Sequence, residues 1–152
     1  MRYEKLQELH DLLFKSMGLF HEKFICQFSK ESSRYLGVKK NHIMIIDFLY
    51  RYQTLTATEI AKKLNMEKGS LTTLIDQLEE FGLITRCKDL NDRRKTMIYL
   101  TDDGKAEMEA IMRDSTQRMD KILSNVELDE LSELISSLGY AVEFMQKIKK
   151  VN

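Results

Sequence analysis

The sequence predicts a mainly α-helical fold with one small β-hairpin, for three reasons. Its 152 residues include no Pro, no Trp and only 6 Gly, a composition that argues against a turn-rich all-β fold. Apolar residues recur every three or four positions along most of the chain, which is the period of one helix face. Two short runs, 83–87 and 96–100, instead have the β-compatible composition of strands. At this length we expect one domain, residues 1–152.

The composition also argues against several classes of protein. No apolar run is long enough to cross a bilayer, and the charged amino terminus lacks the apolar stretch of a signal peptide. We therefore expect a cytoplasmic protein without a membrane partner. Cys26 and Cys87 show neither CxxC nor mixed Cys/His spacing, and His10, His21 and His42 lie on different predicted helices, so we expect no metal and no cofactor. The spacing leaves open whether either cysteine has a redox role.

The first two helices are predicted from their apolar periodicity. Residues 3–35 form a long amphipathic helix that ends near Gly37, a residue type favoured just after a helix. The apolar residues along one side of this helix are Leu6, Leu9, Leu13, Met17, Phe20, Phe24 and Phe28. A second helix over residues 40–52 has apolar side chains on more than one face, so it should be mostly buried.

A helix-turn-helix is predicted at about residues 56–81. Thr56 and Glu59 have the spacing of a capping box, in which each side chain accepts a hydrogen bond from the other residue's backbone N–H. Asn65 can take the left-handed conformation that ends this helix, and another helix runs from about Glu67 to Gly82. The side chains that should face the core from the second helix are Leu71, Leu74, Ile75 and Leu78.

A charged hairpin, or wing, is predicted at about residues 83–100. The segment 88–95 between its two strands is polar and turn-rich. Lys plus Arg and Asp plus Glu are equal at 24 each, so the whole chain lacks the basic surplus usual in DNA-binding proteins. The surplus is local, because 86–95 holds more bases than acids. This basic edge is enough to steer a nucleic acid toward the hairpin.

The last two helices complete the predicted fold. Thr101 is a suitable cap for a helix that continues through Met108 to Ile122. In the final helix, about 128–149, apolar residues are separated alternately by three and four positions, which is a heptad seam. The seam residues are Leu128, Leu131, Ile135, Leu138, Val142 and Met145. A partner helix from a second chain is favoured over an intramolecular bundle, since the first and last helices would otherwise expose large apolar faces.

A helix-turn-helix followed directly by a hairpin suits duplex DNA. The second helix fits the major groove, and basic side chains of the hairpin reach an adjacent minor groove. The runs 67–86, 91–95 and 100–104 resemble the recognition helix, wing and following helix start of the MarR family of transcriptional regulators. The resemblance implies a winged helix-turn-helix with a two-stranded β-wing, and a helical dimerisation domain formed by the first and last helices. DNA binding would lie in 38–104 and dimerisation in 1–36 and 105–152.

The resemblance assigns roles to individual residues. Arg94 would enter the minor groove from the wing tip, and Asp92 would brace the wing through a salt bridge. Many members carry Arg where this chain has Thr73, which argues against bidentate guanine recognition there. The predicted DNA contacts, from the family's helix positions and from the basic edge, are Lys68, Ser70, Thr72, Thr73, Arg86, Arg93, Arg94 and Lys95. The predicted dimer contacts are Leu6, Leu9, Leu13, Leu131, Ile135, Leu138, Val142 and Met145.

Family members of this kind act as homodimers on pseudo-palindromic operators, usually as repressors, and release DNA when a small aromatic or anionic effector binds. The candidates to line an effector pocket are Phe14, Met17, His42, Ile46, Met108 and Met112. No glycine-rich phosphate loop, HExxH or GxSxG motif is present, so we do not expect an enzyme. The alternative is a winged-helix module that binds protein in a larger transcription or chromosome complex, and such a module would tolerate loss of the wing arginines.

Overall fold

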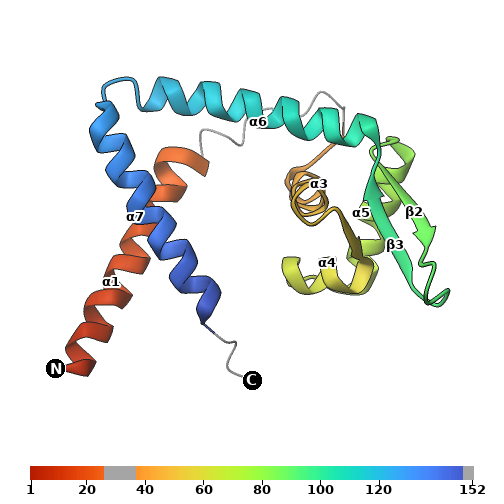
Figure 1. Cartoon of the computed structure of the whole chain (residues 1–152), viewed down its shortest axis with the longest axis horizontal. Helices are drawn as coiled ribbons and strands as arrows, with labels where there is room; N and C mark the ends of the chain where they lie inside the picture. The colour runs from red at the N-terminus through yellow and green to blue at the C-terminus, as the bar shows by residue number, and fades with distance from the viewer. Residues whose placement is uncertain (26–36, 149–152) are drawn as a thin grey trace. The chain divides into compact units, whose positions relative to one another are not determined.

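The computed structural model describes residues 1–25 and 37–148 (Figure 1). Cys26, Phe28, Tyr35 and Lys149 of the predicted helices lie outside this range. The described elements, in chain order, are α1 (Arg2–Phe20), the π-helix η1 (His21–Ile25), α3 (Lys40–Tyr52), β1 (Thr54–Thr56), α4 (Ala57–Leu64), α5 (Lys68–Glu80), β2 (Ile84–Lys88), β3 (Thr96–Leu100), α6 (Asp102–Ile122) and α7 (Leu128–Lys147). None of the helices in these residues has the length and apolar character needed to cross a membrane.

The chain divides into two compact units, Met1–Arg118 and Met119–Asn152. The division falls within α6, whereas the sequence placed the change from the DNA-binding region to the dimerisation region at residues 104 and 105. Unit one contains the helix-turn-helix and the sheet, and unit two contains the end of α6 and all of α7. The mainly helical fold with a small β-wing is confirmed.

The sheet has three antiparallel strands in the order β1-β3-β2, one more than the sequence predicted. In the predicted hairpin, β2 pairs with β3 in a register that places Ile84 opposite Leu100 and Lys88 opposite Thr96. The additional strand β1 pairs with the other edge of β3, with Leu55 opposite Ile98. Three residues are too few to show an alternating pattern, so only the pairing with β3 identifies β1 as a strand. In Figure 1 the hairpin of β2 and β3 extends past helices α3 to α5.

Local hydrogen bonds set the ends of the helix-turn-helix. The Thr56 backbone N–H donates to the Glu59 carboxylate over 2.7 Å, and the Glu59 N–H donates to Thr56 Oγ1 over 3.3 Å, so the predicted capping box begins α4. Asn65 takes the left-handed conformation, with φ of 52°, and ends α4 as predicted. Gly82, with φ of 71°, follows α5 and turns the chain into β2.

One apolar core joins α3, α4, α5 and the sheet. Its fully buried side chains include Ile45, Ile46, Leu49, Ile60, Leu71, Ile75, Leu78, Leu83, Ile84 and Ile98. Each such side chain contributes about 1.5–3 kcal/mol by leaving water. Leu74 also packs against the core but is only half-buried. The shared core fixes the exposed face of α5 relative to the hairpin.

The start of α6 is held against the end of α5. The Thr101 hydroxyl donates to the Gly82 carbonyl over 2.6 Å, and the Thr101 N–H donates to the Leu83 carbonyl over 3.1 Å. The same hydroxyl accepts the Gly104 N–H, as expected of a helix cap. A Cβ at Gly104 would lie 2.0 Å from the Leu83 carbonyl oxygen, so this contact requires glycine.

The first helix differs from its predicted form. It is α-helical only from Arg2 to Phe20 and continues as a π-helix to Ile25. A π-turn holds one more residue than an α-turn, so it shifts the apolar stripe around the helix axis. Apolar periodicity alone did not reveal this change. In unit two, α7 follows the predicted course from Leu128 but ends at Lys147.

Candidate nucleic-acid interface

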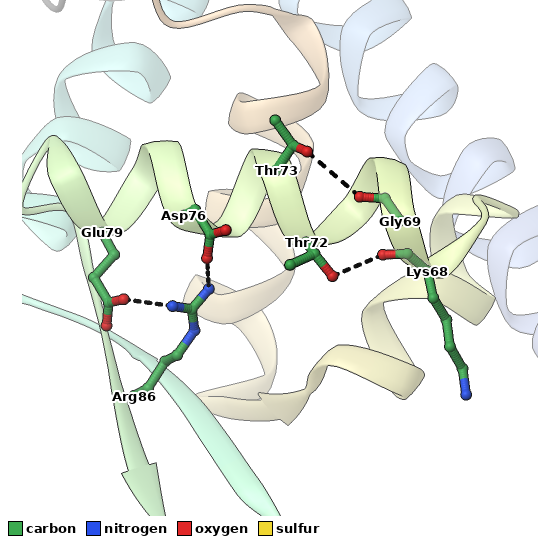
Figure 2. A network of polar contacts seen from close by, with 7 residues as sticks. All are labelled: Lys68, Gly69, Thr72, Thr73, Asp76, Glu79 and Arg86. Carbon is green, nitrogen blue, oxygen red and sulfur yellow. Dashed lines mark hydrogen bonds and ion pairs between the residues drawn. The ribbon is translucent and has the colours of Figure 1, made fainter.

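The exposed face of α5 carries short polar side chains. Lys68, Ser70, Thr72 and Thr73, all predicted from the sequence to contact DNA, are exposed on this helix. The Thr72 hydroxyl donates to the Lys68 carbonyl over 2.8 Å, and the Thr73 hydroxyl donates to the Gly69 carbonyl over 3.5 Å (Figure 2). Gly69 and Thr73 lie on successive turns of the face opposite the core residues, so they form the outermost part of α5.

Arg86 is engaged within the protein. Its guanidinium reaches from β2 to α5, where Nη2 donates to Asp76 Oδ1 and Nη1 donates to Glu79 Oε2 over 2.5 Å (Figure 2). The Arg86 side chain is 31% exposed. Asp76 and Glu79 are three residues apart and therefore share one helix face, which the first wing strand passes. Arg86 was predicted from the sequence to belong to the free basic edge, but the structure places it at the base of the wing in two ion pairs.

The wing tip presents the other three predicted bases to solvent. Arg93, Arg94 and Lys95 are exposed, and the Arg94 side chain is 92% exposed. The Asp92 carboxylate accepts hydrogen bonds from Arg94 Nε over 3.0 Å and from the Arg94 backbone N–H over 3.1 Å. These bonds, chiefly the one from the side chain, hold the pKa of Asp92 below its usual value. Asp92 thus orders the turn and still leaves the guanidinium in solvent.

His42 links α3 to α5 from inside the core. It is 1% exposed, its Nδ1 accepts the Lys39 N–H over 3.0 Å, and its Nε2 lies 2.9 Å from Gln77 Oε1. Because Nδ1 accepts, the neutral ring carries its proton on Nε2 and donates it to Gln77. Burial is the main cause that lowers the pKa of His42. Gln77 is therefore held by its oxygen, and it stays exposed with its two amide N–H donors available.

The six candidate pocket residues occupy two kinds of environment. His42, Ile46 and Met108 are buried in the core of unit one. Phe14, Met17 and Met112 are instead 64%, 65% and 43% exposed.

Two helices expose apolar stripes. In α1 the exposed fractions are 53% for Leu6 and 46% for both Leu9 and Leu13. In α7 no residue is buried, and Ile135 and Leu138 are 62% and 56% exposed. Val142 and Met145 are also exposed, whereas Leu131 is half-buried.

Comparison with known proteins finds a family match. The MarR family model matches residues 39–96, which extend from the residue before α3 to the first residue of β3. This part of the chain therefore resembles the MarR family of transcriptional regulators, whose members bind DNA.

Similar proteins and solved structures cover most of the chain. The HTH-type transcriptional repressor YetL of Bacillus subtilis is 29% identical over 78% of this chain and 71% of its own length. The structure of a MarR family protein from Bacillus stearothermophilus has a TM-score of 0.73 at 20% identity, and covers 97% of this chain and 99% of that one. A variant of MepR from S. aureus bound to an oligodeoxyribonucleotide has a TM-score of 0.61 at 24% identity, and covers 90% of this chain and 97% of that one.

The sequence predicted no role for the polar residues that tie α5 to neighbouring elements, which are Asp76, Gln77 and Glu79. The sequence did contain a signal for Asp76 and Glu79, because these acids are three residues apart in one helix and the next strand contains Arg86. No sequence pattern pairs Gln77 with His42, which lies 35 residues away.

Proposed function

We propose that this protein is a MarR family repressor that binds a pseudo-palindromic operator as a homodimer. The observation that carries the proposal is that one rigid core presents both the polar outer face of α5 and the exposed bases Arg93, Arg94 and Lys95 of the wing. A helix of this kind fits the major groove and reads base edges there. Arginine on a wing suits the negative potential of a narrow minor groove.

The homodimer is supported by the apolar stripe of α7. This helix buries none of its side chains in a single chain, although its stripe follows a heptad pattern over Leu131, Ile135, Leu138, Val142 and Met145. Contiguous apolar surface of this extent normally marks an interaction site. Two copies related by a two-fold axis would present two recognition helices, which matches the symmetry of a palindromic operator.

Repression and its relief by a ligand are the finer parts of the proposal. Repression is supported by the relative YetL, whose name describes a transcriptional repressor. A small aromatic or anionic effector that prefers one dimer conformation would weaken operator binding by the ratio of its affinities for the two conformations. Phe14, Met17 and Met112 are the candidate pocket residues exposed enough to meet such a molecule.

The test begins with selection from random duplexes by the purified full-length protein. The recovered sequence is then used in anisotropy titrations at fixed salt, with sedimentation velocity as the measure of oligomeric state. We expect a two-fold symmetric sequence bound by a dimer, and weaker binding by Arg94→Ala at unchanged thermal stability. A monomer at micromolar concentration, or Arg94→Ala with unchanged affinity, would support a protein-interaction module instead.

A further inference from the structure

The hydrogen bonds of α5 determine which of its side chains are free to read bases. Glutamine reads adenine with both its oxygen and its amide, and a carboxylate reads cytosine by accepting from the amino group. The Gln77 oxygen accepts from His42, and Asp76 and Glu79 bind Arg86. Gln77 therefore keeps only its amide protons for a base, and Asp76 and Glu79 each have one oxygen engaged by Arg86, so none of the three offers its full set of polar atoms.

The threonines at the middle of α5 retain only part of their hydrogen-bonding capacity. A hydroxyl has one proton and two acceptor lone pairs. Thr72 and Thr73 direct that proton to the carbonyls of Lys68 and Gly69, one turn earlier in the helix (Figure 2). While these bonds are kept, each threonine offers an incoming base an acceptor and a methyl group, and the Thr73 bond is the longer of the two at 3.5 Å.

The major groove contains one base pair that fits both features. Guanine presents only the acceptors O6 and N7, which a threonine hydroxyl can bind only by giving up its hydrogen bond to the helix carbonyl. Cytosine presents an amino donor but no methyl group. An A·T pair presents both the adenine N6 amino donor and the thymine methyl group.

We propose that Thr72 and Thr73 select A·T pairs at the centre of each operator half-site, a specificity that rests on the DNA binding proposed above. The thymine methyl group packs against a threonine methyl group, and a threonine oxygen accepts from adenine N6. The Lys68 side chain is exposed at the first turn of α5 and makes no hydrogen bond or ion pair within residues 1–25 and 37–148, so it is free to contact guanine or phosphate at that end of the helix.

Gly69 supports a close approach at this place. Its φ is not positive, and a Cβ built on it would meet nothing within 4 Å, so the fold does not require glycine here. Glycine nevertheless lowers helix stability by about 1 kcal/mol relative to alanine. The missing side chain clears the turn directly before Thr73, where a base edge would come nearest to the helix.

The experiment first removes the methyl group from the base. It then removes the methyl group or the hydroxyl from each threonine. Each thymine of the selected half-site is replaced by uracil, which lacks only the methyl group, and affinity is measured by anisotropy. For wild type we expect a loss of about fourfold per half-site at one or two adjacent central positions, the effect of one buried methyl group. Uracil in the flanks serves as the control.

Matched variants then assign the contact to the threonines. Thr72→Val and Thr73→Val keep the methyl branch and should keep the uracil penalty, whereas Thr72→Ser and Thr73→Ser should lose it at the position that each residue reads. Both positions are exposed, so thermal melting should match wild type within about 0.5 kcal/mol, the usual range for surface changes. A selected guanine at the centre, or a uracil penalty that the Ser variants retain, would overturn this specificity and leave DNA binding intact. Failure to enrich any sequence would overturn the specificity and the proposed function together.

Discussion

The ion pairs of Arg86 make a prediction that distinguishes orientation of the wing from direct contact with phosphate. Asp76→Ala and Glu79→Ala together remove two negative charges from the DNA-facing helix and also remove both partners of Arg86. If Arg86 orients the wing, this double variant should bind operator more weakly than wild type. If Arg86 binds phosphate directly, the same variant should bind more tightly, because two repulsive charges are gone and the guanidinium is free.

The size of the effect follows from the geometry. Partly exposed ion pairs contribute about 0.2–1 kcal/mol each, so the folded state should lose about 0.5–2 kcal/mol when both are removed. Operator binding should also weaken, because a wing that samples several orientations must be ordered again when it meets DNA. Ordering a few rotamer-rich side chains costs about 0.5–1.5 kcal/mol each, which corresponds to about a tenfold loss of affinity for one or two of them.

The assay is a binding cycle with four proteins: wild type, the double acid variant, Arg94→Ala, and the combination. Affinities are measured by anisotropy at one salt concentration, at a temperature where melting curves show all four to be folded. If Arg86 orients the wing, removing the two acids should reduce operator affinity only slightly in the Arg94→Ala background. The Arg94 contact with DNA, which depends on the orientation of the wing, is already absent there. Tighter binding by the double acid variant, or losses that add in the combination, would refute the positioning role.

Four other predictions concern the fold, operator binding and the dimer. Gly104→Ala should destabilise unit one by several kcal/mol, because its Cβ would lie 2.0 Å from a backbone oxygen, whereas Gly69→Ala should stabilise it by about 1 kcal/mol and weaken operator binding. The lowered pKa of His42 means that the unfolded chain binds a proton more readily, so unfolding free energy should fall as pH decreases below the usual histidine value of 6.5. Leu138→Asp would place an unpaired charge in the dimer seam and should yield monomer in sedimentation.

The controls for these predictions are matched to them. His42→Gln should flatten the pH dependence contributed by this residue in thermal melts, and an equal slope in both proteins would show that other groups cause it. Gly104→Ala with an unchanged melting temperature would mean that α6 moves away from the Leu83 carbonyl at little cost. A Leu138→Asp protein that remains dimeric would place the interface elsewhere than on α7.

Local sequence patterns predicted the helix-turn-helix and the hairpin accurately. Three of these features depend only on residues close to them in the chain, so the local sequence is enough to predict them. They are the capping box of Thr56 and Glu59, the left-handed Asn65, and Gly82. The range of α3 was also correct, because its apolar residues repeat over the whole helix. The strand β1 was missed, since three residues have no period and pair only through tertiary contact.

The sequence predicted which residue types the candidate site contains, but only some of the contacts that these residues make. The exposed threonines and wing bases lie where the sequence placed them, on α5 and at the wing tip. Arg86 was misplaced because local composition shows a basic cluster but not which base turns inward toward Asp76 and Glu79. The bond between His42 and Gln77 likewise depends on the packing of α3 against α5.

The salt dependence of operator binding tests most directly whether the protein reads duplex DNA with α5 and the wing. A dimer that neutralises about six to ten phosphates should give a slope of log affinity against log salt of about −5 to −9, although the chain has no net charge. Changing Arg93 and Lys95 together to Gln should make the slope shallower by up to about four, since two wings would each lose two charges. A flat response in wild type, or an unchanged slope in the Arg93 and Lys95 variant, would contradict the account.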